Sequence, residues 1–521
     1  MPNLIFYNGT VLTMDPAKPR ASALALRGER ILAVGDEEVL NLAHSGTERI
    51  DLEGSYLLPG FHDSHVHLTQ HGLELERLHL HDTPTLEAAL ARISKCAQSL
   101  SPSSWLLGSG FSMSRWGVSH LDKTELDRVA PNHPVFLQSQ DHHSAWVNSL
   151  ALERANVHAG TPDPKSGTVV RDEQGEPSGL LLERAAQLVS SVIPEPSDAG
   201  LSQALRRGGA DMANLGVTTV HHMAYEPTSY WRQLALGASR EDFPVRVWAC
   251  IPQEDAEHAA AFGLATGQGG SRFMVGGAKF FADGALGSMT AWMLEPYDDT
   301  DNHGISVHDA EVLAERLPLV LDAGLTPVIH AIGDAANRTV IDAFEKTSFR
   351  WRSKGLRPRL EHAQHLHADD IVRAGALGLV VSMQPYHLVF DAPQIRARLS
   401  KRVTDAYAMK SLLKAGAHLA LGSDTPVANP DVRLGLRAAC TRLGVDKEKG
   451  PLNPSECLTP TEALESYTRG AAYAIRRENR SGILQRGFDA DMVVLSDNPL
   501  ETLDFEVRGT MLAGGWTKRL E

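Results

Sequence analysis

Two histidines, His65 and His67, are separated by one residue at the end of the stretch Pro59-Gly60-Phe61-His62-Asp63-Ser64-His65-Val66-His67. In a strand, side chains two residues apart point to the same face, so both imidazoles can reach one ion. Single polar residues also follow apolar runs far downstream, namely Lys279, His330, His362 and Asp424. Four histidines, one aspartate and one lysine form a ligand set that suits one or two divalent metals of the zinc type.

Lys279 is the member of this set that needs an explanation. An ordinary lysine has a pKa near ~10.4 and is cationic at neutral pH, so it would repel a metal. In the apolar strand-like run Gly277-Ala278-Lys279-Phe280-Phe281 its pKa should fall. The neutral amine can then take up CO2 to form a carbamate, whose two oxygens can bridge two cations. The alternative is an unmodified lysine that donates to a substrate or pairs with Asp283.

Eight short apolar runs that end in polar residues alternate with helical segments. They lie at 61–67, 217–222, 245–251, 276–282, 326–331, 359–363, 378–383 and 418–423. A closed parallel barrel needs eight such units. Each proposed ligand falls at or near the C-terminal end of its run, which is the edge where these barrels carry their chemistry. The sequence therefore predicts an α/β protein with a (β/α)8 TIM barrel over residues 57–479.

The remaining segments do not fit the barrel. Residues 1–56 contain strand-like runs broken by Asn8-Gly9 and Gly28-Glu29, which is typical of antiparallel hairpins, and further strands are indicated in residues 480–521. We expect both ends to form one small composite β-sandwich domain. Residues 70–200 are too long for an ordinary crossover, so we interpret them as an insertion after the first barrel strand that shapes the pocket.

Near the end of the barrel segment, Thr459-Pro460-Thr461-Glu462 has the spacing of a capping box with proline at the first helical position. This pattern predicts a helix that begins there and runs to Ala474.

Composition argues against several classes of partner. The net charge of -14 and the pI near 5.9, with no run of lysine and arginine, disfavour nucleic acid and anionic membranes. The 4 cysteines lack paired spacing, which favours free thiols in a reducing compartment and hence a cytoplasmic protein. No run approaches the ~20 apolar residues of a membrane span, so we expect a soluble protein. Homo-oligomers are compatible with such a barrel, although no apolar stripe specifies an interface.

These motifs resemble the amidohydrolase superfamily of metal-dependent hydrolases, in particular its family 3 branch, the YtcJ-like proteins that include N-substituted formamide deformylases. Besides the first histidine motif, the resemblance rests on Asp141 to Ser149, Lys279 to Gly284, Ile329 to Asp334, Glu361 to Gln364 and Gly422 to Pro426. It runs nearly end to end.

The resemblance implies a (β/α)8 barrel with a binuclear centre, for which Zn2+ is the expected metal. The counterparts of His65, His67 and Asp424 bind one metal in the family, and those of His330 and His362 bind the other. The counterpart of Lys279 is a carboxylated bridge between the two metals.

Two metals ~4 Å apart can share a hydroxide and polarise a carbonyl. We therefore expect hydrolysis of a C–N bond other than a peptide bond, in a small N-substituted formamide or another N-acyl compound. A metal-bound hydroxide would attack the carbonyl, and Asp424 would pass its proton to the leaving nitrogen.

Three alternatives remain at this point. A lactone or ester hydrolase would use the same metal chemistry. A deaminase is disfavoured because His330 is followed by Ala331-Ile332-Gly333 rather than by an acidic residue, although Asp334 comes next. A non-catalytic binding protein built on the same fold would be expected to lose ligands, whereas this chain keeps all six.

Further residues are candidates for contacts with a substrate, namely His143, Trp146, Asp283, His222 and Tyr386. His143 follows Asp141 and His142 in a cluster that also fits a capped turn, and aromatic residues of a barrel protein pack more often in the core than against a ligand. The pair His221-His222 departs from the family, which more often has a single polar residue there.

Overall fold

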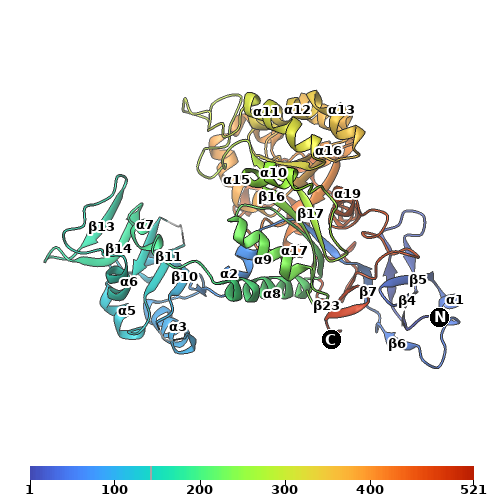
Figure 1. The fold of residues 1–521 in the computed structure, drawn as a ribbon, viewed down its shortest axis with the longest axis horizontal. Coiled ribbons are helices and arrows are strands. Elements are labelled where there is room, and N and C mark those ends of the chain that lie inside the picture. The colour runs from blue at the N-terminus through green and yellow to red at the C-terminus, as the bar shows by residue number, and fades with distance from the viewer. Residues whose placement is uncertain (102, 141–142, 521) are drawn as a thin grey trace. The chain divides into compact units, whose positions relative to one another are not determined.

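The computed structural model describes residues 1–101, 103–140 and 143–520, and the chain divides into two compact units (Figure 1). Met1–Gly72 and the chain from Leu201 onward form the first unit, and Leu73–Gly200 form the second. The predicted ligands all belong to the first unit.

The first unit is built on a parallel sheet of eight strands. They are β8 (Phe61–Val66), β15 (Val217–His222), β16 (Arg246–Pro252), β17 (Phe273–Phe281), β18 (Thr326–Ala331), β19 (Arg359–His362), β20 (Val380–Met383) and β21 (His418–Leu421). Each strand pairs in parallel with the next, and a parallel bridge between Val66 and Thr425 brings the segment after β21 back to β8. This nearly closed ring confirms the TIM barrel, and each predicted run overlaps one observed strand.

Helices connect the barrel strands or follow the last of them, and they pack with the strands in one large apolar core. They include α8 (Asp198–Asn214), α9 (Thr228–Ala238), α10 (Ala256–Ala261), α11 (Ala310–Asp322), α12 (Asp334–Lys346), α14 (Ala368–Leu377), α15 (His387–Arg398), α16 (Met409–Ala415) and α17 (Val432–Thr441). The start of α11 is fixed by Asp309, whose side chain accepts the backbone N–H groups of residues 311 and 312. Its end is fixed by Gly324, which adopts φ +81° at little steric cost.

Two smaller sheets contain the chain ends. One comprises β1 (Leu4–Tyr7), β4 (Ala23–Arg27), β5 (Arg30–Gly35) and β6 (Glu48–Asp51). The other joins β2 (Thr10–Leu12), β3 (Arg20–Ala21) and β7 (Tyr56–Pro59) to β22 (Met492–Leu495), β23 (Val507–Leu512) and β24 (Gly515–Lys518). Strands from both ends therefore share a sheet, and residues of both sheets share one apolar cluster. The sandwich arrangement and its domain boundaries stay predictions.

Two hairpins were predicted in the N-terminal segment. The hairpin at Gly28-Glu29 is confirmed, since β4 and β5 pair antiparallel across it. The prediction of a hairpin at Asn8-Gly9 is wrong, because β1 and β2 lie in different sheets. Asn8 adopts a left-handed φ of +55°, and the chain passes there from one sheet to the other.

The helix predicted from 460 to 474 is interrupted. The capping box of Thr459 and Glu462 is present, but α18 (Pro460–Ser466) ends before a second helix, α19 (Arg469–Ala474), begins. The break has a tertiary cause, because the carbonyl of Tyr467 accepts a hydrogen bond of 2.8 Å from the backbone N–H of His62 on β8. That carbonyl is therefore used by the barrel rather than by the helix.

The second unit has a sheet of its own. Its strands are β9 (Leu78–His79), β10 (Leu106–Phe111), β11 (Val135–Ser139), β12 (Ser144–Val147), β13 (Gly167–Arg171) and β14 (Pro177–Glu183), and its helices include α3 (Leu86–Ser99), α5 (Lys123–Val129) and α6 (Ser149–Arg154). Its role in shaping the pocket stays a prediction.

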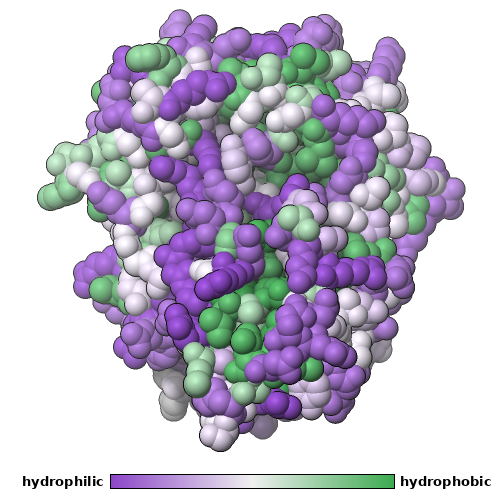
Figure 2. All heavy atoms as spheres, turned by 90° about the vertical axis from the view of Figure 1, so that its right-hand side faces the viewer, coloured by the Kyte–Doolittle hydropathy of each residue, from purple (hydrophilic) through white to green (hydrophobic). Residues whose placement is uncertain are grey.

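No helix within the described ranges is both long and apolar enough to cross a lipid bilayer. On the face shown in Figure 2, hydrophilic residues surround a smaller group of hydrophobic ones in the lower half. This face therefore presents mainly polar side chains to solvent.

A buried ion pair joins the barrel to the terminal sheet. The guanidinium of Arg246, at the start of β16, donates to both carboxylate oxygens of Asp491 at 2.7 and 2.9 Å. Asp491 directly precedes β22, and the two residues are only 1% and 5% exposed. Breaking such a pair leaves an uncompensated charge in the interior.

Arg246→Ala should therefore lower the free energy of unfolding by about 3–5 kcal/mol. The control is Arg206→Ala, which removes a 3.1 Å pair with Asp242 between side chains that are 45% and 55% exposed. It should cost less than about 1 kcal/mol. Denaturant unfolding of both variants measures the difference, and equal losses would contradict the structural role of the buried pair.

Candidate metal centre

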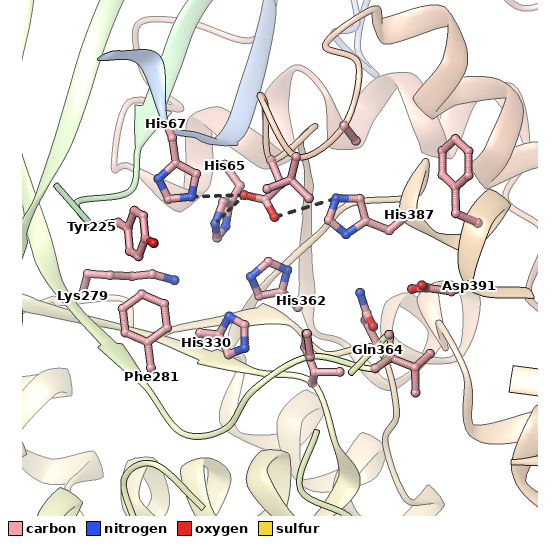
Figure 3. Close-up of a pocket in the computed structure, with 18 of the residues that line it drawn as sticks. His65, His67, Tyr225, Lys279, Phe281, His330, His362, Gln364, His387 and Asp391 are labelled. Carbon is pink, nitrogen blue, oxygen red and sulfur yellow. Dashed lines mark ion pairs between the residues drawn. The ribbon is translucent and has the colours of Figure 1, made fainter. Parts of the chain in front are cut away.

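A cavity of about 570 Å³ lies at the C-terminal ends of the barrel strands. All six predicted ligands line it, namely His65, His67, Lys279, His330, His362 and Asp424 (Figure 3). They lie in or just after strands that are far apart in the sequence, and the barrel brings them to one edge. Ligation of a metal by each of them stays a prediction.

The backbone fixes Asp424 beside the histidine pair. Its N–H donates to the carbonyl of His65 at 2.7 Å, and the N–H of His67 donates to the carbonyl of Thr425 at 2.8 Å. Consequently the Oδ1 atom of Asp424 lies 3.5 Å from Nε2 of His65 and 3.2 Å from Nε2 of His67. Asp424 and His362 both adopt left-handed backbone, with φ of +64° and +70°. Such strain persists where surrounding contacts enforce it, as they do at functional sites.

A buried hydrogen bond fixes the proton of His65. Its Nδ1 lies 2.7 Å from Oε2 of Glu361, which also accepts from the guanidinium of Arg359 at 2.8 Å through Oε1. Burial alone would raise the pKa of Glu361, but Arg359 and His65 hold it at about 2. Because the carboxylate is ionised and can only accept, Nδ1 of His65 carries the proton and Nε2 carries a lone pair.

That lone pair faces Oδ1 of Asp424, so two acceptors meet without a proton between them. Burial also lowers the pKa of His65 to about 4, which keeps the imidazole neutral. A cation between Nε2 and Oδ1 would satisfy both atoms. The carboxylate on the far nitrogen is the arrangement that orients histidine ligands in metal proteins.

The other members of the set have similar features. His330 donates through Nε2 to the carbonyl of Gly284 at 2.9 Å, which leaves Nδ1 with its lone pair. In the part of the chain that the structure describes, the buried atoms Nδ1 of His362 and Nζ of Lys279 have no hydrogen-bond partner. Buried polar atoms without partners are uncommon and costly. The donor set therefore fits a divalent metal.

His387 is a site residue that the sequence reasoning missed. It begins α15, and its Nε2 lies 3.8 Å from Oδ2 of Asp424. His362, His387 and Asp424 form a second group of ligand atoms that lie within 4.8 Å of one another. The available signal was its position shortly after β20, at the strand edge that carries the other ligands. Its neighbour Tyr386 packs against Phe390 at 5.5 Å between ring centroids, and the substrate contact predicted for Tyr386 stays a prediction.

Asp283 anchors the backbone of two loops at the strand ends. Its carboxylate accepts the N–H groups of Trp292, Ile332 and Gly333 at 2.8, 2.9 and 2.8 Å. These bonds fix the loops that follow β17 and β18. The predicted contact of Asp283 with a substrate stays a prediction.

His222 is buried at the end of β15 with both ring nitrogens engaged. Its Nδ1 accepts from the backbone N–H of Leu68 at 3.2 Å, and its Nε2 lies 3.4 Å from Glu226. These partners orient the side chain. Whether His222 also contacts a substrate stays a prediction.

The two other substrate candidates belong to the second unit. Trp146 is fully buried in the core of that unit. His143 lies on its surface with Nδ1 3.0 Å from Glu183. The residues before His143 in the same cluster, Asp141 and His142, lie outside the described residues. The roles of His143 and Trp146 stay predictions.

A TIM barrel with histidine and carboxylate ligands at the strand ends is the architecture of a metal-dependent hydrolase. Comparison with known protein families supports this assignment. The sequence model of the family described as "Amidohydrolase family" matches residues 48–515. The chain therefore belongs to the amidohydrolase family.

Three relatives define its neighbourhood within the family. YtcJ of Bacillus subtilis (strain 168), an amidohydrolase by name, is 34% identical over 95% of this chain and 94% of its own length. The N-substituted formamide deformylase of Arthrobacter pascens is 28% identical over 98% of this chain and 96% of its own. The crystal structure of an uncharacterized metal-dependent hydrolase from Pyrococcus furiosus superposes with a TM-score of 0.80 at 28% identity, covering 95% of this chain and 99% of that one.

The role of Glu361 can be tested through metal affinity. Glu361→Gln keeps the volume but removes the charge that orients His65, so affinity for zinc should fall about 10- to 100-fold. Zinc retained after dialysis against graded chelator measures this, with near-ultraviolet circular dichroism to verify the fold.

The matched control is Glu183→Gln, which alters a carboxylate 3.0 Å from a histidine Nδ1 on the surface of the second unit. It should leave zinc retention unchanged. If Glu361→Gln retained zinc as the wild type does, the orienting role assigned to Glu361 would be wrong.

Proposed function

We propose that this protein hydrolyses the C–N bond of small N-acyl compounds, with N-substituted formamides as the leading substrate class. The observation that carries the proposal is the pair of facing acceptors, Nε2 of His65 and Oδ1 of Asp424, on the wall of a cavity large enough for a small ligand. The similarity to a formamide deformylase along nearly the whole chain supports the substrate class.

His65, His67 and Asp424 would hold one divalent metal, and His330 and His362 a second, with zinc as the leading identity because imidazole and carboxylate ligands suit it. Metals bound there would acidify water and polarise the substrate carbonyl. The remaining tasks belong to side chains of the protein.

Asp424 is suited to move the proton. Burial alone would raise the pKa of Asp424, but the hydrogen bond from His67, whose Nε2 lies 3.2 Å from Oδ1, helps to hold it well below its usual value. The carboxylate is therefore ionised and can accept a proton. The same carboxylate lines the cavity and can deliver that proton to the leaving nitrogen. An amide nitrogen must be protonated before it can leave as an amine.

Lys279 is suited to become a bridging carboxylate. Its side chain is 1% exposed, and burial lowers the pKa of Lys279, which favours the neutral amine. Nζ can then form a bond to the carbon of CO2 and release one proton, which produces a carbamate. The two oxygens of this carbamate would face the cavity that the other predicted ligands line.

Asp424→Asn should reduce kcat on N-pentylformamide by roughly 10³-fold or more, because the amide side chain cannot carry the proton. The fold and most of the bound metal should remain. The control Asp242→Asn changes a surface carboxylate that is 55% exposed and should retain wild-type turnover. Turnover of Asp424→Asn at the wild-type rate would exclude the proton transfer assigned to Asp424.

Lys279→Ala should abolish most activity and weaken binding of the second metal. Acetate or propionate has the two-oxygen geometry of a carbamate, so either should restore part of kcat when zinc is also supplied. Equal concentrations of chloride provide the control for ionic strength. If Lys279→Ala kept two metals and near-normal rates without added carboxylate, the bridging role would be wrong.

A further inference from the structure

The cavity has a second polar wall that the proposed chemistry does not use. His387, Phe390 and Asp391 of α15 line it together with Gln364, which follows β19. Because these positions of α15 are three and four residues apart, they lie on one face of the helix. Figure 3 shows Asp391 and Gln364 on the side of the pocket away from Lys279.

Asp391 is oriented by a hydrogen bond, and no lysine or arginine among the described residues pairs with it. Its Oδ2 accepts the hydroxyl of Tyr407 at 2.6 Å, and Tyr407 is fully buried. The nearest group that can carry a positive charge is the imidazole of His387, four residues earlier on α15, which lowers the pKa of Asp391. Burial raises the pKa of Asp391 by more than Tyr407 and His387 lower it.

Gln364 adds an amide group to the same wall. Its side chain is 3% exposed, and its Oε1 is buried with no hydrogen-bond partner in the part of the chain that the structure describes. Its backbone carbonyl accepts the N–H of Tyr407 at 2.7 Å, so Gln364 and Asp391 share one anchor. Because no hydrogen bond holds Oε1 in place, the amide can turn this oxygen toward a ligand. A carboxylate beside such an amide favours a ligand that brings donors of its own.

The rest of the cavity restricts the shape and charge of that ligand. Apolar side chains form much of the lining of the cavity, among them Phe281, Leu286, Ile332, Phe390 and Val427. Such a surface suits a chain of methylene groups. Among the described residues that line the cavity, Lys279 is the only lysine or arginine, and it belongs to the predicted ligand set. An anionic group at the α15 wall would therefore meet Asp391 without compensation.

We propose that Asp391 and Gln364 form a recognition subsite for an ammonium group carried by the substrate at the end of its N-alkyl substituent. This inference rests on the proposed function, and it narrows the substrate class to N-(ω-aminoalkyl) formamides and related amides. A charged donor bound by a carboxylate forms a stronger hydrogen bond than a neutral donor does. The subsite therefore selects the cation over an alkyl chain of the same length.

The test compares three probes on the metal-loaded enzyme. They are N-(4-aminobutyl)formamide, the neutral N-pentylformamide of the same length, and N-(4-hydroxybutyl)formamide, which donates without charge. The wild type should show a kcat/KM for the cationic probe that is about 10- to 100-fold higher than for the pentyl probe, mainly through KM. The hydroxybutyl probe should fall between them.

Asp391→Asn should bring the ratio of the cationic to the pentyl kcat/KM close to one, because asparagine can still accept from Tyr407 but has lost the charge. Gln364→Met, which removes the second acceptor, should lower the same ratio in part, and it provides an independent variant if Asp391→Asn does not fold. The control Asp242→Asn, at an exposed site, should keep the wild-type ratio.

Equal kcat/KM values for the cationic and pentyl probes in the wild type, or a ratio unaffected by both site variants, would overturn the subsite. A hydroxybutyl probe as good as the cationic one would overturn the requirement for charge. If the wild type hydrolyses none of the probes, the proposed function fails for this class. Without turnover, the dissociation constants of the same probes can be measured by calorimetry. Tighter binding of the cationic probe than of the pentyl probe, abolished by Asp391→Asn, would support the subsite. Equal affinities of the two probes would overturn it.

Discussion

The buried hydrogen bond between His65 and Glu361 is the interaction on which the site depends. It determines which nitrogen of His65 carries the proton and therefore which one faces Asp424. Arg359 compensates the charge of Glu361 and also donates to the carbonyl of Ser64 and to His221. The hydrogen bonds of Arg359 and Glu361 thus connect β8, β15 and β19 in the barrel interior. A change in either side chain would affect both the packing of the strands and the orientation of His65.

Closure of the barrel and assembly of the site are the same event. Asp424 reaches the histidine pair only because the segment after β21 bonds to β8 through Val66, His65 and His67. These contacts join the first and last strands of the ring. The site therefore exists only in the closed barrel, and the closing contacts hold Asp424 in its left-handed backbone conformation.

The barrel, and the six polar residues that line its cavity, could be predicted because both follow from local patterns, namely apolar runs that end in polar residues. The break at Tyr467 could not, since its cause is a hydrogen bond to His62 on a distant strand. His387 was missed because it lies on a helix beyond its strand rather than at the strand end. The passage between sheets at Asn8 has the same local sequence as a hairpin turn, so only the partners of each strand distinguish the two.

The sheet shared by both chain ends has a consequence for synthesis in the cell. β7 pairs with β22, which is translated only after the whole barrel, so at ribosomal rates of ~5–20 residues per second the N-terminal strands wait for tens of seconds. During that interval β7 presents an unpaired edge, a surface that promotes misassociation. The nascent chain would therefore benefit from chaperones that shield its N-terminal strands, and slow translation of the barrel would prolong its exposure.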